Sequence, residues 1–185
     1  MSQPVRAEES FYDAGLEILA SDGYAGLKLA PLCAHLGVTT GSFYHRFDNW
    51  ADFTSRLIAH WHQQRTTMLV NLVAAEPDPI HRLKMLHDVA MSLPHRAEAA
   101  IRAWSAIDPS VRAVQAAVDE ERYQVVLETF RALVPEPDAM SYARTALFLV
   151  AGRELAGDDS SHDETADATL SWALRLLINT ATTRS

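Results

Sequence analysis

The sequence predicts an all-α fold of about nine helices, with a short three-helix N-terminal domain and a helical bundle after it. Apolar residues recur at helical spacing along the whole chain of 185 residues. Signals for strands, such as sustained alternation or an Asn-Gly hairpin, are nearly absent. Proline and glycine interrupt the apolar stripes at positions that suit helix ends.

The first helix presents one apolar stripe that includes Phe11, Ile18 and Leu19. It ends at Asp22-Gly23, because glycine readily adopts the positive φ of a helix C-terminus. A short helix follows over about 28–35, then a turn at Leu36-Gly37-Val38 and a second short helix over about 39–45.

A long fourth helix begins after Asp48 or Asn49, either of which is a good N-cap, and runs to about residue 75. The string Glu76-Pro77-Asp78-Pro79 ends it, since proline is tolerated in the first turn of a helix and not inside one. We therefore expect an N-terminal domain over 1–48, a connecting helix over 49–75 and a C-terminal domain over 76–185.

The C-terminal domain is predicted to be entirely helical. Prolines again mark helix starts and breaks, at Pro109 and over Pro135-Glu136-Pro137. The helices are expected over about 79–92, 95–106, 109–133, 138–156 and 162–181.

Composition narrows the possible classes of protein. The net charge is −8 and 48% of the residues are hydrophobic, so the chain is not a polybasic nucleic-acid coat and has enough apolar residues for a core. A single cysteine, Cys33, rules out an intramolecular disulfide. We see neither a signal peptide nor a membrane-length apolar stretch, which predicts a cytoplasmic protein without a membrane partner.

The two short helices joined at Gly37 have the pattern of a helix-turn-helix. Such a pair needs a small residue where its helices pack closest, a residue tolerant of positive φ in the turn, and large apolar residues around it. Cys33 is the small residue, which favours a buried packing role over a reactive thiol. Leu32, Phe43 and Phe47 supply apolar bulk.

The same segment is the acid-free part of an acidic N-terminal region. Residues 23–47 contain Lys28, Arg46 and two histidines but no Asp or Glu, which is typical of a DNA-facing surface in an acidic protein. Hydroxyls, an imidazole and the N–H groups of a helix N-terminus suit phosphates and base edges. The predicted DNA-binding residues are Lys28, Thr39, Thr40, Gly41, Ser42, Tyr44, His45 and Arg46.

The string Gly37-Val-Thr-Thr-Gly-Ser-Phe-Tyr-His-Arg-Phe47, with Gly23-Tyr24 upstream, resembles the signature of the TetR family of transcriptional regulators. The resemblance covers about the first third of the chain. It departs from the family where Leu27-Lys28 replaces a hydroxyl cap, and where Asn49-Trp50 opens the fourth helix in place of Lys-Glu. These departures affect the phosphate contacts and leave the fold unchanged.

The resemblance implies a homodimer that binds a palindromic double-stranded DNA operator and responds to a small-molecule effector, with repression released by the ligand as the expected sign. It also implies an effector cavity between the fourth and the middle helices. The predicted lining is Trp61, Arg65, Met68, His87 and Trp104. The last two helices are apolar over more than one stripe, which predicts a subunit interface with Tyr142, Phe148, Leu149, Trp172 and Leu176.

Other functions have weaker support in the sequence. The histidines lack regular metal-ligand spacing, and no phosphate-binding glycine loop or hydrolase motif is found, so we predict no metal site, no catalytic residue and no cofactor. A helical protein-interaction module without DNA binding is the main alternative. A small helical enzyme ranks last.

Overall fold

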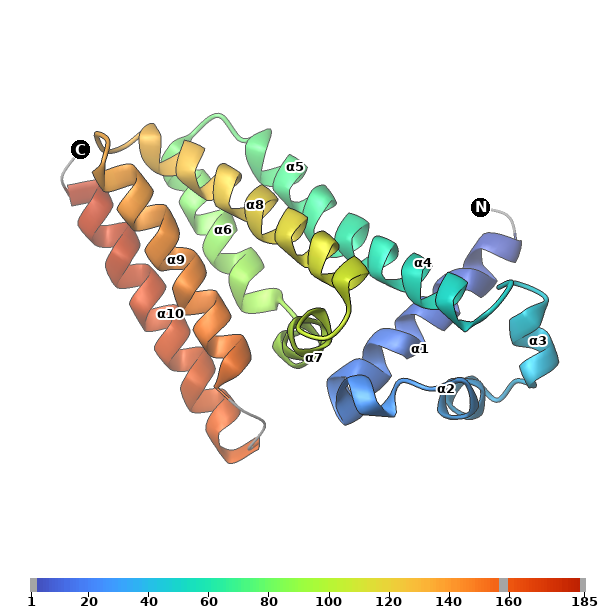
Figure 1. Cartoon of the computed structure of the whole chain (residues 1–185). Coiled ribbons are helices and arrows are strands. Elements are labelled where there is room, and N and C mark those ends of the chain that lie inside the picture. The colour runs from blue at the N-terminus through green and yellow to red at the C-terminus, as the bar shows by residue number, and fades with distance from the viewer. Residues whose placement is uncertain (1–2, 157–159, 184–185) are drawn as a thin grey trace. The chain divides into compact units, whose positions relative to one another are not determined.

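The predicted all-α fold is confirmed. The computed structural model describes residues 3–156 and 160–183, except the side chains of 3–7, 65 and 160–163, and these ranges contain helices and no strand. Figure 1 shows the order of the helices. They are α1 (Gln3–Gly26), α2 (Leu29–Leu36), α3 (Thr40–Tyr44), α4 (Trp50–His62), α5 (Met68–Ala74), α6 (Pro79–Ser92), α7 (His95–Ser105), α8 (Pro109–Arg131), α9 (Asp138–Leu155) and α10 (Ser160–Thr183).

Most helix ends lie within a few residues of their predicted positions, because local chemistry determines them. Asp78 caps α6 by accepting hydrogen bonds from the N–H groups of Ile80 and His81, both at 3.2 Å, and Pro79 occupies the first position of that helix. Gly23 has a φ of 66° and a ψ of −172°, so the regular part of α1 ends there as predicted, although a helical turn continues to Gly26.

The long fourth helix differs from its prediction. Instead of one α-helix over 49–75, a π-helical segment over Gln63–Thr67 separates α4 from α5. Thr66 and Thr67 are β-branched, which lowers their α-helix propensity. No proline or glycine marks this position, so the sequence contained no signal for the break.

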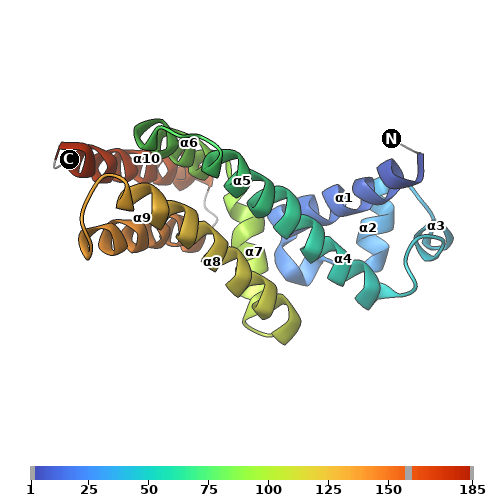
Figure 2. The ribbon, with the colours of Figure 1, turned by 90° about the horizontal axis from the view of Figure 1, so that it is seen from above.

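The chain divides into two compact units. The first unit contains residues 1–63 and 94–115, and the second contains 64–93 and 116–185. This division differs from the expected boundaries, because α7 packs along α1 and belongs with the N-terminal helices. Figure 2 shows α7 beside the end of α1, far from it in sequence.

The second unit has its own hydrophobic core. α10 packs against both α6 and α9, and α5 packs against α6. Valine, leucine, phenylalanine and alanine side chains from α5, α6, α8, α9 and α10 fill the interior, with Phe130 and Leu83 among the most buried. Within the described residues, no helix is both long enough and apolar enough to cross a membrane.

Candidate nucleic-acid interface and ligand cavity

The turn between α2 and α3 has the geometry of a helix-turn-helix. Gly37 follows α2 with a φ of 64° and a ψ of 30°, in the left-handed region that favours glycine. The N–H groups of Gly37 and Val38 donate to the carbonyls of Ala34 and Cys33 at 3.1 and 3.0 Å. The last carbonyls of α2 are thereby satisfied and the chain turns directly into α3.

An aromatic cluster holds α3 in place. Phe43 of α3 and Phe47 beyond it are fully buried, and their rings lie 5.0 Å apart between centroids. Phe11 of α1 and Phe53 of α4 meet both rings edge to face, at 5.1 to 6.0 Å. Such edge-to-face contacts fix the orientation of α3 on α1 and α4.

Cys33 is part of the packed interior under the turn, as expected. Its thiol is buried, and burial raises the pKa of the thiol above its ordinary value. A raised pKa keeps the sulfur in its unreactive thiol form, so the side chain acts as a small apolar group.

The outer face of α3 presents the predicted DNA-binding residues to solvent. Thr39 caps the helix, with its Oγ1 accepting a hydrogen bond from the Ser42 N–H at 3.3 Å. Tyr44 is 56% exposed. The exposed residues on this face are Thr39, Thr40, Gly41, Tyr44 and His45, and Ser42 is partly exposed.

The two cations of the acid-free segment differ in their surroundings. Lys28 is exposed at the start of α2 and makes no capping hydrogen bond with its side chain. Arg46 folds back on the chain: its Nη1 donates to the Ser42 carbonyl at 2.8 Å, and its guanidinium lies 5.7 Å from the centroid of the Phe11 ring. Arg46 therefore covers the C-terminal end of α3 instead of extending into solvent.

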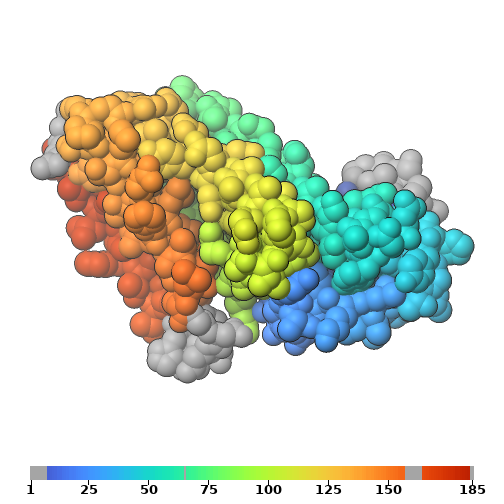
Figure 3. All heavy atoms as spheres, in the orientation of Figure 1, coloured from blue at the N-terminus to red at the C-terminus, as the bar shows by residue number. Residues whose placement is uncertain are grey.

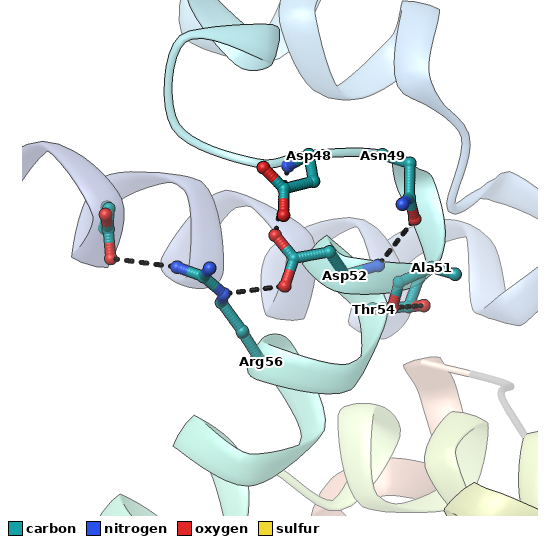
Figure 4. Close-up of polar contacts among 7 residues, drawn as sticks. Asp48, Asn49, Ala51, Asp52, Thr54 and Arg56 are labelled. Carbon is teal, nitrogen blue, oxygen red and sulfur yellow. Dashed lines mark hydrogen bonds and ion pairs between the residues drawn. The ribbon is translucent and has the colours of Figure 1, made fainter.

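A polar network that the sequence analysis did not identify fixes the start of α4 (Figure 4). Asn49 Oδ1 accepts from the Asp52 N–H at 3.0 Å, and Asp52 Oδ2 accepts from the Asp48 N–H at 3.1 Å. Arg56 Nε donates to Asp52 Oδ1 at 2.8 Å, and its Nη1 lies 3.9 Å from Glu8 of α1. The hydrogen bond to Asp52 raises the pKa of Arg56.

Trp50, the aromatic residue beside the Asn49 that replaces a typical family lysine, packs against the aromatic cluster. Its ring lies 5.1 Å from Phe53 and 5.9 Å from Phe43, between centroids. The side chains at the start of α4 are thus occupied by contacts within the chain. The exposed polar surface of this region is formed by α3 and the turn before it.

The second unit contains a cavity of about 90 Å³. Its lining comes from the π-helical segment, α5, α6, α8, α9 and α10, and is almost entirely aliphatic. The residues are Thr66, Leu69, Val70, Val73, Leu83, Leu86, His87, Val89, Ala90, Leu93, Arg122, Val125, Val126, Phe130, Ala146, Leu147, Val150, Leu174, Leu177 and Ile178.

The predicted effector residues are not brought together in this cavity. His87 lines it, whereas Met68 of α5 is 52% exposed. Trp61 and Trp104 lie in the first unit, where Trp61 bonds to Glu98 and Trp104 stacks on Tyr24 with centroids 4.6 Å apart. The side chain of Arg65 lies outside the described residues.

The predicted interface residues on α9 and α10 separate into two groups. Phe148, Trp172 and Leu176 are 68%, 61% and 52% exposed. Tyr142 and Leu149 are partly buried against the core, and the Tyr142 ring stacks on Phe130 at 5.2 Å. Figure 3 shows side chains of α9 and α10 forming part of the surface of the second unit.

A helix-turn-helix at the N-terminus and a second helical unit with an apolar cavity are typical of DNA-binding transcriptional regulators. Residues 11–55 match the sequence profile described as "Bacterial regulatory proteins, tetR family". These residues form a TetR-family N-terminal domain, which confirms the resemblance. No curated protein matches the chain at a significant level.

Solved structures extend the likeness to the whole chain. A transcriptional regulator from Rhodococcus sp. Rha1 is 17% identical, with a TM-score of 0.75 over 98% of each chain. A TetR transcription regulator from Haloarcula marismortui is 19% identical, with a TM-score of 0.72 over 93% of this chain and 98% of its own. A protein described as a transcriptional regulator from Saccharomonospora viridis, solved with choline, is 16% identical, with a TM-score of 0.74 over 92% and 96%. The chain therefore has the TetR-family fold.

Proposed function

We propose that the chain is a non-enzymatic transcriptional repressor that binds a palindromic operator as a homodimer and is released by a small molecule. The observation that carries the DNA-binding part is the exposed face of α3. This face holds hydroxyl groups, an imidazole and a glycine, and it lies in a segment without Asp or Glu.

Gly41 gives that surface a specific feature. Its φ is not positive, and a Cβ built on it would meet only Thr39 Oγ1, at an ordinary 3.6 Å. Neither the backbone conformation at Gly41 nor the packing around it within the chain requires a glycine. A glycine at an exposed helical position nevertheless lowers the stability of the helix by about 1 kcal/mol relative to alanine. A bare backbone at this point suits the close approach of another surface, such as a groove of DNA.

The homodimer is supported by α9 and α10. Phe148 on α9, with Trp172 and Leu176 on α10, places large apolar side chains in solvent on two helices that pack side by side. Gly152, one turn after Phe148, is exposed, and nothing lies within 4 Å of a Cβ built on it. A glycine there lets a helix of a second copy approach closely.

The small molecule would act by changing the equilibrium between two states of the dimer. It shifts this equilibrium only by its difference in affinity for the DNA-binding and the released state. The choline complex of the Saccharomonospora viridis protein supports the idea that a chain of this fold holds a small ligand. In this chain the cavity of the second unit is the proposed place.

The experiment is DNA binding by the purified full chain, measured by fluorescence anisotropy with fragments from upstream of its own gene. We expect tight binding to one roughly palindromic site, and Gly41→Ala is expected to weaken it by about tenfold or more while the helix becomes slightly more stable. Absence of binding to every upstream fragment at low salt contradicts the proposal. Unchanged binding by Gly41→Ala contradicts the role given to α3.

A further inference from the structure

We propose that the cavity of the second unit takes a compact, uncharged molecule with an apolar body and one hydrogen-bonding oxygen, and that the Thr66 hydroxyl recognises this oxygen. The inference rests on the proposed function in one respect: it takes the occupant of the cavity to be the effector. The argument uses the hydrogen bonding of Thr66, the charges around the cavity, and its size.

Thr66 carries a buried hydroxyl without a partner. The residue is 1% exposed and lines the cavity, and its Oγ1 makes no hydrogen bond in the described part of the chain. A buried hydroxyl without a partner is unfavourable, because it loses its bonds to water and gains nothing in exchange. A ligand oxygen that accepts a hydrogen bond from the Thr66 hydroxyl therefore satisfies this group, and the hydroxyl needs no rearrangement of the cavity wall to make the bond.

Three other helical threonines show what is different at Thr66. The hydroxyls of Thr129, Thr145 and Thr180 donate to the carbonyls four residues earlier, at 2.7, 2.8 and 2.8 Å. This is the usual arrangement for a threonine inside an α-helix. Thr66 lies in the π-helical segment, where the α-helical register is interrupted, and its hydroxyl has no such bond. π-Helical turns of this kind are frequent at functional sites.

The charged and polar groups beside Thr66 are already engaged. Arg122 lines the cavity, and its Nη1 lies 4.0 Å from Oε1 of Glu154, whose side chain is almost fully buried. His87 uses both ring nitrogens: Nε2 lies 3.0 Å from Ser171 Oγ, and Nδ1 lies 3.1 Å from Asp88. Among the described lining residues, the Thr66 hydroxyl is thus an uncharged polar group whose hydrogen-bond partner is missing.

This pattern selects against charged ligands. A carboxylate near Arg122 would compete with Glu154 and leave a buried negative charge poorly compensated, which is unfavourable. A quaternary ammonium ion is bound by carboxylates or by several aromatic faces. Phe130 is the one aromatic residue among the described lining residues. A neutral molecule avoids both difficulties.

The volume limits the size of the ligand. A cavity of about 90 Å³ has several times the roughly 10–15 Å³ needed for one water. It is smaller than the apolar cavities of about 150 Å³ that hold benzene. A molecule with a few heavy atoms fits without rearrangement of the walls, and a larger one must displace lining side chains.

The test uses five small probes of nearly equal size: 1-butanol, 2-butanone, pentane, butanoate and butylammonium. Each is titrated into the full chain without DNA, and binding is followed through the methyl NMR signals of leucine and valine side chains. We expect 1-butanol and 2-butanone to bind at least about tenfold more tightly than butanoate and butylammonium, with shifts concentrated on cavity residues.

Thr66→Val tests the hydroxyl, because valine has nearly the shape of threonine. The variant is expected to bind 1-butanol about three- to tenfold more weakly and pentane with unchanged affinity. Thr66→Ser restores the hydroxyl and is expected to recover most of the loss. Thr180→Val, on the exposed side of α10, is the matched control and should leave all affinities unchanged.

Three results overturn the inference: no probe binds, a charged probe binds as tightly as 1-butanol, or Thr66→Val weakens pentane and 1-butanol equally. None of them affects DNA binding measured separately by anisotropy. Conversely, selective binding of 1-butanol in a chain that ignores its upstream DNA contradicts the proposed function and leaves the ligand class standing. The two proposals therefore fail in distinguishable ways.

Discussion

The indole Nε1–H of Trp61 donates a hydrogen bond of 2.9 Å to Oε1 of Glu98, and both side chains are buried in the interior of the first unit. Trp61 comes from α4 and Glu98 from α7, so the bond joins two helices separated by the whole of α5 and α6 in sequence. With the packing of α7 along α1, it explains why α7 belongs to the first unit.

Replacing Trp61 with phenylalanine tests this relationship. The change removes the donor and leaves a buried carboxylate with one partner fewer, so we expect a loss of about 1.5–3 kcal/mol in the free energy of unfolding, measured with urea. Ile107→Val, at an exposed residue of the first unit, should change it by less than about 0.5 kcal/mol. Equal effects of the two substitutions would show that the buried bond contributes no stability.

The homodimer prediction concerns Phe148. Phe148→Lys places a charge in the proposed apolar interface, so we expect the variant to sediment as a monomer in analytical ultracentrifugation, whereas the parent chain sediments as a dimer. Its melting temperature should also lose its dependence on protein concentration. Ile107→Lys alters an equally exposed apolar residue in the first unit and should remain dimeric. A monomeric parent chain would contradict the proposed interface.

The acid stability of the chain is expected to depend on Asp108. Its Oδ1 accepts hydrogen bonds from the Ser110 hydroxyl at 2.7 Å and from the N–H groups of Ser110 and Val111 at 2.9 and 3.3 Å. The Ser110 hydroxyl is the main reason that the pKa of Asp108 lies below its ordinary value. A lowered folded-state pKa means that the stabilisation is present above the unfolded pKa, near 4, and is lost as the pH falls through the folded pKa.

Asp108→Ala is therefore expected to lose about 1 kcal/mol near neutral pH, where the cap at the start of α8 is intact. The difference from the parent chain should shrink below about pH 4, as followed by urea unfolding across the acid range. Asp108→Asn keeps an oxygen acceptor but cannot titrate. It should therefore lose less stability at neutral pH than Asp108→Ala, and its free energy of unfolding should depend less on pH in the acid range than that of the parent chain. A constant difference at all pH values would contradict the role of the ionised carboxylate.

The sequence predicted those features that depend on local chemistry. Proline marked the starts of α6 and α8, and Gly37 with Phe43 and Phe47 was enough to predict the helix-turn-helix. These residues carry their signal in their own backbone preference or apolar bulk. The boundary between the two units was harder to predict from the sequence. It depends on the packing of α7 against α1, and no local sequence pattern indicates which distant helices pack together.

The cavity shows a second kind of limit. The sequence analysis selected the large aromatic residues Trp61 and Trp104, but both find packing partners in the first unit. The cavity is instead formed by small aliphatic side chains from several helices, and such residues look the same in sequence whether they fill a core or border a space. The sequence also did not indicate that Thr66 borders the cavity with an unpartnered hydroxyl. This feature accompanies the π-helical segment, and no proline or glycine marks that segment in the sequence.

The salt dependence of DNA binding tests the charge of the proposed interface. Among the described residues of the acid-free segment 23–47, Lys28 and Arg46 carry the fixed positive charges, and Arg46 is folded onto the Ser42 carbonyl and the Phe11 ring. Each neutralised phosphate contributes about −0.9 to the slope of log K against log salt concentration, so Lys28 in each of two subunits gives a slope of about −2. The slope is about −4 where Arg46 also leaves the Ser42 carbonyl and binds a phosphate.

Lys28→Ala should reduce the magnitude of that slope by about 2, one unit for each subunit, and leave the free energy of unfolding unchanged because its side chain is exposed. Lys84→Ala, at an exposed lysine of α6 in the second unit, is the matched control and should leave the slope as it is. Anisotropy titrations between about 50 and 200 mM salt give both values. A parent slope near −10 would require many more phosphate contacts than this surface offers, and an unchanged slope in Lys28→Ala would remove the start of α2 from the interface.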